Sequence, residues 1–136
     1  MSIITSELEI PPDYDLADCA VSGGSLKAYI QALSRITHGK MCLVIRRENR
    51  DFPLPARDGM GRSLSQQELE TLKEGRTCRF SPVLCAEYFT YLDRDTAHVV
   101  LFDTERSIRE KLRTAEEWGK GLVMVEDPAL RNLLGI

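Results

Sequence analysis

The sequence predicts a single α/β or α+β domain, with a mixed sheet of about five strands and three to four helices. A length of 136 residues suits one hydrophobic core and is short for two. The composition, 43% hydrophobic and 29% charged, is that of an ordinary folded protein. Runs with helical periodicity alternate with β-rich runs along the chain. We therefore treat residues 1–136 as one domain.

The first predicted helix covers residues 26–36. Leu26, Ile30 and Leu33 share one face, and Ser25 is placed to cap the helix after a pair of glycines. The segment "SGGS" resembles in part the phosphate loop of the ATP pyrophosphatase families, whose aspartate–serine pair is missing here. We interpret it as the start of a helix, which ends at Gly39.

Three further helices are predicted from their ends. Ser65 and Glu68 form a capping box that opens a short helix of about 65–74. A longer helix follows at about 105–118, with its apolar residues on one side. The last is a short one that begins at Pro128, directly after Asp127.

The β-rich runs fall between these helices. The run at 41–47 is apolar on both faces and predicts a central strand, while 2–10 predicts an edge strand. Residues 48–51 predict a turn, and the prolines of "FPLP" exclude 52–55 from a sheet interior. The remaining predictions are a strand at 76–80, a hairpin at 86–103 with its turn at 93–96, and a buried strand at 122–126.

Charge is unevenly spread over a chain whose net charge is −3. Residues 40–62 carry six basic and three acidic side chains, a net of +3. Arg46, Arg57 and Arg62 in this segment are candidates for binding an anion or an acidic partner. Nucleic-acid binding is not expected, because the overall balance is acidic and no aromatic residues are interleaved with the basic ones.

No complete catalytic or metal-binding motif is present. The four cysteines include no closely spaced pair, so neither a metal site nor a cofactor is expected. Asp103 and Asp127 each end a predicted strand, where paired carboxylates can hold Mg²⁺, but both are also placed to cap a helix. His98 falls within a predicted strand and reads as a packing or surface residue. We therefore name no catalytic residue.

An aromatic run stands out in the first strand of the hairpin. Alternation places Tyr88 on one face and Phe89 and Tyr91 on the other. A central strand with two covered faces is one interpretation. The other is a partner interface, which favours a homodimer.

These observations favour a non-enzymatic binding or regulatory protein of the cytosol that acts through protein–protein contacts. The alternative is a small enzyme or sensor that binds an anionic small molecule near Arg46–Arg62. The longest apolar run has about five residues, far below the roughly 20 that cross a bilayer, so no membrane contact is expected. The first residues lack the basic and apolar regions of a signal peptide.

Overall fold

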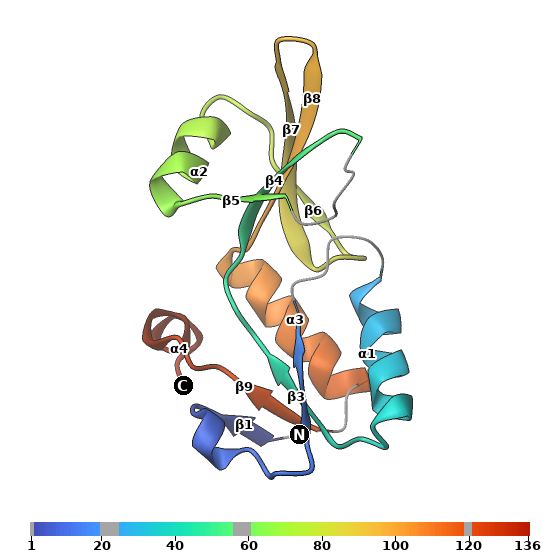
Figure 1. The fold of residues 1–136 in the computed structure, drawn as a ribbon. Coiled ribbons are helices and arrows are strands. Elements are labelled where there is room, and N and C mark those ends of the chain that lie inside the picture. The colour runs from blue at the N-terminus through green and yellow to red at the C-terminus, as the bar shows by residue number, and fades with distance from the viewer. Residues whose placement is uncertain (1, 20–24, 56–60, 119–120) are drawn as a thin grey trace.

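The computed structural model describes residues 2–19, 25–55, 61–118 and 121–136. Within them the chain forms four helices and two sheets of four and five strands, which confirms the mixed α and β class. The strands divide between two sheets instead of forming one (Figure 1). The elements are β1 (Ser2–Ile4), the 3-10 helix η1 (Glu7–Glu9), β2 (Asp15–Asp18), α1 (Leu26–Ile36), β3 (Met41–Val44), β4 (Asn49–Pro53), β5 (Arg62–Ser63), α2 (Gln66–Lys73), β6 (Arg79–Ser81), β7 (Ala86–Asp93), β8 (Thr96–Phe102), α3 (Glu105–Trp118), β9 (Leu122–Met124) and α4 (Pro128–Leu134).

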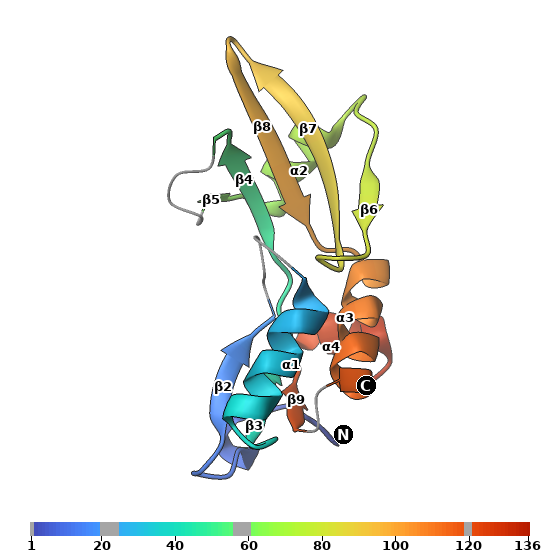
Figure 2. The ribbon, with the colours of Figure 1, turned by 90° about the vertical axis from the view of Figure 1, so that its right-hand side faces the viewer.

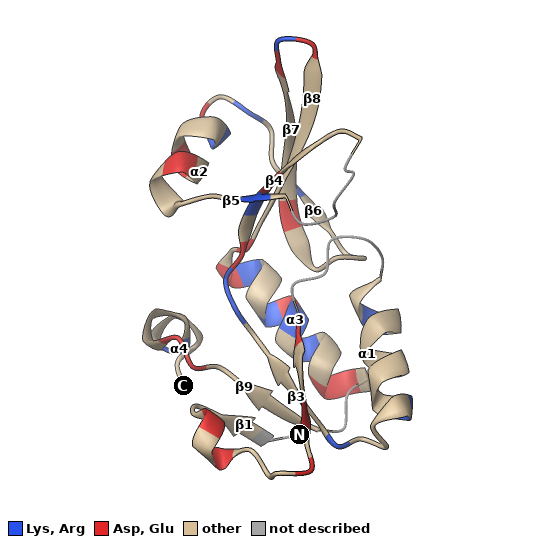
Figure 3. Ribbon diagram, in the orientation of Figure 1, with Lys and Arg blue, Asp and Glu red and all other residues tan. Residues whose placement is uncertain are grey.

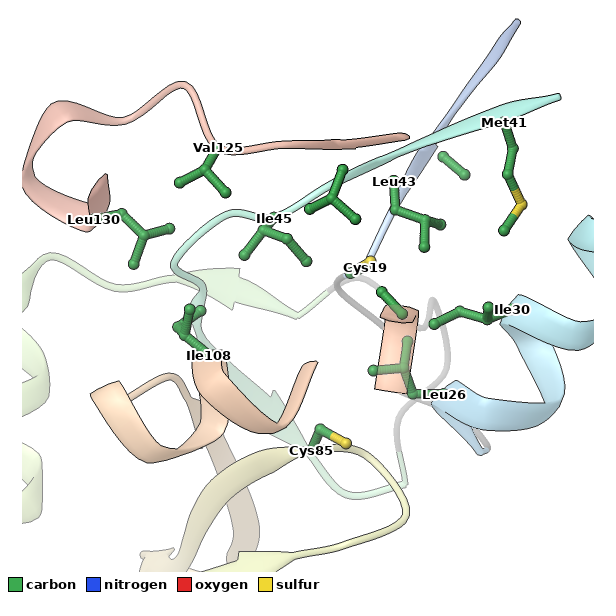
Figure 4. Close-up of a cluster of buried hydrophobic side chains, with 13 residues drawn as sticks. Cys19, Leu26, Ile30, Met41, Leu43, Ile45, Cys85, Ile108, Val125 and Leu130 are labelled. Atoms are coloured by element: carbon green, nitrogen blue, oxygen red, sulfur yellow. The ribbon is translucent and has the colours of Figure 1, made fainter. Parts of the chain in front are cut away.

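The first sheet is parallel throughout, with the strand order β1-β9-β3-β2. We call this sheet and helices α1, α3 and α4 the parallel lobe. The three helices cover one face, as Figure 2 shows for α1 and α3. Apolar residues from sheet and helices meet there in the main core, among them Leu43, Ile30 and Ile108 (Figure 4). β3 is buried along its whole length and is central, as predicted.

The connection from β1 to β2 crosses the opposite face of the parallel sheet. The chain steps from β2 to β3 to β9 through helices on one face, whereas β1 to β2 runs back across the sheet. A right-handed crossover in the reverse direction has to use the other face. Ile10 of this connection packs against Cys42, Val44 and Met124, so both faces of the sheet are covered.

The second sheet is antiparallel, with the strand order β5-β4-β8-β7-β6. We call this sheet and α2, residues 49–102, the antiparallel lobe. It is inserted between β3 and α3, and stands above the parallel lobe in Figure 1. Leu69 and Leu72 of α2 pack with Phe89, Val100 and Phe102 on one sheet face.

Two expectations from the sequence are corrected in the antiparallel lobe. Residues 49–51 are not a turn but the start of β4, which pairs with β8 along its length. β4 is also interior, although it ends in Pro53. The proline is tolerated because β5 pairs only with Arg50 and Asp51, so that Pro53 has a neighbouring strand on one side alone.

The predicted helix starts are confirmed with one correction. Ser25 and Ser65 accept hydrogen bonds from the backbone N–H groups of Ala28 and Glu68, and Asp127 caps α4. For α3, the capping hydroxyl belongs to Thr104 instead of Asp103, since Thr104 Oγ1 accepts from Ser107 N at 3.3 Å. The glycines that precede Ser25 lie outside the described residues. None of the described helices has both the length and the apolar character that a membrane span requires.

Candidate functional site

A cleft of about 400 Å³ lies at the carboxyl ends of β3 and β9. The carboxyl ends of parallel strands form one edge of a sheet, and open α/β sheets bind their ligands outside that edge. At this edge the chain runs from β3 toward β4 and from β9 toward α4. Side chains from both connecting segments line one cleft. The lining residues are Glu7, Val44, Ile45, Arg46, Arg47, Glu48, Met124, Glu126, Asp127 and Pro128.

The charged groups of the cleft differ in how firmly they are held. Arg46 Nη1 lies 3.8 Å from Asp18 Oδ2, and Glu48 Oε2 accepts from Arg50 Nε at 3.2 Å. Asp127 Oδ1 is occupied at the start of α4 by the N–H of Ala129, at 2.9 Å. Glu48 and Asp127 are therefore committed within the protein, whereas the exposed Arg46 is held only by a long ion pair.

Glu7, Arg47 and Glu126 are the charged groups of the cleft that remain available. All three are exposed, and within the described part of the chain none has an ion-pair partner. Figure 3 shows basic and acidic residues following one another along the segment between β3 and β4. The cleft thus offers one guanidinium donor, from the segment after β3, and two carboxylate acceptors, one from η1 and one from the segment after β9.

The three predicted arginines do not form one site in the described structure. Arg46 lines the cleft, whereas Arg62 lies on β5 in the other sheet. The Arg62 guanidinium donates to Glu68 Oε2 at 2.8 Å, an interaction that raises the Arg62 pKa and lowers the pKa of Glu68. Arg57 lies outside the described residues. An anion-binding role for these arginines stays a prediction.

The aromatic residues of β7 pack on both faces of the antiparallel sheet. Phe89 is 1% exposed and packs against Phe102, with ring centroids 5.9 Å apart. Tyr91 is half-buried and donates its hydroxyl to Asp51, while its ring stacks on His98 at 4.6 Å. Tyr88 is half-buried on the other face. The predicted homodimer, which light scattering would test, stays a prediction.

The two candidate carboxylates from the sequence end up in different places. Asp127 lies at the cleft, but Asp103 follows an antiparallel strand and is buried beside Lys111, at 2.8 Å. The sequence did not single out Glu126. The available signal was its position at the end of the predicted strand 122–126, directly before the candidate Asp127. Among the described residues no three His, Cys, Asp or Glu side chains gather as a metal site would need.

No protein-family model matches the chain, and no curated protein does. Solved structures do match its fold. The spore cortex-lytic enzyme SleL of Bacillus cereus matches over 79% of this chain and 28% of its own, with 20% identity and a TM-score of 0.58. A chitinase of Chromobacterium violaceum matches over 98% of this chain and 44% of its own, with 22% identity and a TM-score of 0.55. SleL of Bacillus megaterium matches over 73% and 24%, with 24% identity and a TM-score of 0.50.

These similarities establish the fold and correct the function expected from the sequence. This chain spans less than half the length of each of the three proteins. All three are enzymes by name, two of them cortex-lytic and one a chitinase. The expectation of a non-enzymatic regulatory protein that acts through protein contacts is therefore wrong.

Proposed function

We propose that this chain is a domain of a carbohydrate-active enzyme and that the cleft at the ends of β3 and β9 binds the sugar chain. The observation that carries the proposal is the fold, which is similar to that of a chitinase over 98% of this chain. The position of the cleft supports it as well, because parallel strands followed by helices present ligand sites at their carboxyl ends. The substrate class that we propose is a polysaccharide of the chitin type.

The chemistry of the cleft suits a polyhydroxylated ligand. The Arg47 guanidinium has several N–H donors for sugar and amide oxygens, and the Glu126 carboxylate accepts from sugar hydroxyl groups. Hydrogen bonds with a charged partner are roughly twice as strong as neutral ones. An open cleft with one such donor and one such acceptor would fix the orientation of a sugar unit.

We assign to this chain the binding of the sugar and one candidate carboxyl group for cleavage of the glycosidic bond. Hydrolysis of a glycosidic bond usually needs two carboxyl groups on opposite sides of the bond. Asp127 is committed to capping α4 and Glu48 to Arg50. Of the two exposed carboxylates that remain, Glu7 lies on the 3-10 helix η1, whereas Glu126 follows the parallel strand β9. Glu126 is therefore the residue to test for a part in cleavage.

The test is a titration with N-acetylglucosamine oligosaccharides, followed by calorimetry and by amide shifts in NMR spectra. We expect the shifts to cluster at residues 46–48 and 126–128, and Arg47→Ala and Glu126→Gln each to weaken binding about tenfold. Arg113→Ala is the matched control, because Arg113 is exposed on α3 and pairs with Glu110 at 2.7 Å. Release of reducing ends, compared between the parent chain and Glu126→Gln, tests cleavage. Absence of binding, or binding that both cleft variants leave unchanged, would refute the proposed site.

The cytosolic location expected from the sequence is part of this proposal. All four cysteines are free thiols, and Cys19, Cys42 and Cys85 are buried. Free thiols are typical of a reducing compartment. Fractionation of cells that produce the tagged chain would test it, and recovery outside the cytosol would contradict it.

A further inference from the structure

We propose that the buried Asp103–Lys111 ion pair is a positioning device that fixes the angle between the two lobes, and thereby the width of the cleft. The part of this inference that concerns the cleft rests on the proposed function. The part that concerns the angle stands on the geometry of the hinge alone.

The hinge consists of two chain segments that run side by side. The chain passes from the parallel to the antiparallel lobe through residues 45–48, and returns through Asp103 and Thr104. Asp103 N donates to Glu48 O at 3.0 Å, and Glu48 N donates to Asp103 Oδ2 at 3.0 Å. The two crossings are thus joined to each other at the level of Glu48 and Asp103.

The Asp103 carboxylate fastens this joint to helix α3. Lys111 Nζ donates to Oδ1 at 2.8 Å and to Oδ2 at 3.0 Å, and Ser107 Oγ donates to Oδ1 at 2.7 Å. Asp103 is 2% exposed and Lys111 is 3% exposed. Every oxygen of the carboxylate is held, so the hinge has one defined position relative to the helix.

The other polar contacts between the lobes are individually weak, although Cys85 is also buried in the main core. Leu26 N donates to Val83 O at 2.9 Å, the Arg106 guanidinium lies 4.2 Å from the centroid of the Phe80 ring, and Cys85 Sγ lies 3.7 Å from Thr114 Oγ1. A hinge between two packed bodies needs only a few residues that change their backbone angles. The ion pair is the strongest local constraint on that change.

The hinge also forms a wall of the cleft. All four residues of the outgoing crossing, 45–48, line the cleft, and Arg46, Arg47 and Glu48 are its charged members. A change in the backbone angles within residues 45–48 would move these side chains relative to those that follow β9. The cleft is therefore held at one width as long as Asp103 and Lys111 hold the crossing.

Stability and positioning can be separated by experiment. Replacing both members of a buried ion pair with neutral residues of similar size is often neutral for stability. Asp103→Asn with Lys111→Met should then leave a folded protein whose lobes move. Glu105→Gln with Arg109→Met is the matched control, because that pair lies exposed on the same helix at 2.9 Å.

The measurement is the distance between two spin labels, one in each lobe. Leu92→Cys and Ile36→Cys are suitable sites, being 72% and 75% exposed, in a Cys78→Ser background that leaves only buried thiols. We expect the distance distribution to become about twice as wide in the double variant and to stay unchanged in the control. A distribution like that of the parent would overturn the proposal.

Two further readouts keep the outcome decisive. If the double variant fails to fold, Asp103→Leu with Lys111→Met replaces the pair by hydrophobic residues of similar volume, which is often neutral for stability, and a width equal to the parent's would then refute the proposal. Sugar binding is measured separately. Wider distances with unchanged binding would refute only the link to the cleft, whereas an absence of binding in the parent would refute the proposed function and leave the hinge result standing.

Discussion

Each lobe of the molecule contains or adjoins one buried aspartate, and the two are held by different chemistry. Asp103, where the antiparallel lobe joins α3, is 2% exposed and faces the ammonium group of Lys111 at 2.8 Å. Asp51, inside the antiparallel sheet, is 3% exposed and is bound by the Tyr91 hydroxyl and by His98 Nδ1 at 2.8 Å. One carboxylate thus depends on a buried lysine, and the other on a phenol and an imidazole.

The difference shows how each region is tied together. Asp103 connects a hinge to a helix through a single cation that is buried with it. Asp51 contacts side chains from three other strands, namely Arg62 on β5, Tyr91 on β7 and His98 on β8. Arg62 is exposed and 3.8 Å away, so its contribution is small. The loss of one partner should therefore be far more costly at Asp103 than at Asp51.

The largest expected effect follows from Lys111→Met alone. This variant leaves the Asp103 carboxylate buried without its cation, which typically costs about 3–5 kcal/mol. Urea denaturation measures the loss in the free energy of unfolding. The double variant Asp103→Asn with Lys111→Met should recover most of it, and a single variant as stable as the parent would contradict the importance of the pair.

Asp51→Asn should have a smaller effect, of about 1–3 kcal/mol. The asparagine keeps one oxygen acceptor but loses the charge that strengthens the hydrogen bonds from Tyr91 and His98. The same denaturation measurement gives the value, with Asp93→Asn as the exposed control in the same sheet. A loss greater than that of Lys111→Met would reverse the proposed ranking of the two sites.

The sequence predicted local structure better than it predicted these partnerships. The helix at 26–36 and the capping box at Ser65 depend on neighbours within four residues, and both are confirmed. The division into two sheets depends on pairings such as β4 with β8, in which Asp51 lies opposite Val100, 49 positions along the chain. Periodicity carries no information about such pairings. β2 was missed for a related reason, since only Ala17 is buried among its four residues.

The candidate site could be predicted only in part. Arg46 and Asp127 were singled out, and both line the cleft. Arg47 and Glu126 were not chosen as site residues, because their availability depends on which neighbours find an ion-pair partner, and this is a property of the folded chain. Lys111 was not distinguished from any exposed lysine of an amphipathic helix, since its partner lies eight residues earlier and outside that helix.

Alkaline pH should affect the two lobes through different groups. Burial raises the pKa of Cys19 in the parallel lobe from 9.0 to about 12. In the antiparallel lobe, burial and then the hydrogen bond to Asp51 raise the pKa of Tyr91 from 10.0 to about 12. A raised pKa means that folding favours the protonated form. The stability that each group contributes is complete below its unfolded pKa and is lost as the pH rises toward 12.

The measurement is the free energy of unfolding between pH 8 and pH 12. We expect Cys19→Ala to remove the part of the decline that begins near pH 9, and Tyr91→Phe the part that begins near pH 10. Tyr91→Phe also removes the hydroxyl from Asp51, so the comparison is made on the slopes and not on the absolute values. Identical slopes in the parent and both variants would show that neither group is responsible.

The smallest expected effect concerns the tip of the β7–β8 hairpin. Asp93 pairs with Thr96, which leaves Arg94 and Asp95 as a two-residue turn, and of these two only Arg94 has a positive φ, at 58°. A turn with positive φ at its first central residue favours glycine there. Arg94→Gly should relieve a left-handed conformation that costs a non-glycine residue about 1–2 kcal/mol. Part of that gain is lost to the greater freedom of glycine in the unfolded chain, so we expect a net stabilisation of about 0.5 kcal/mol. Asp95→Gly is the matched control and should destabilise, because it brings the entropy cost without relieving strain.

Hydrogen exchange of Arg94→Gly then shows whether the stabilisation is confined to the antiparallel lobe. With only two crossings between the lobes, we expect slower exchange for amides of β7 and β8 and unchanged exchange for those of β3, whereas equal slowing in both lobes would mean that they open as one unit.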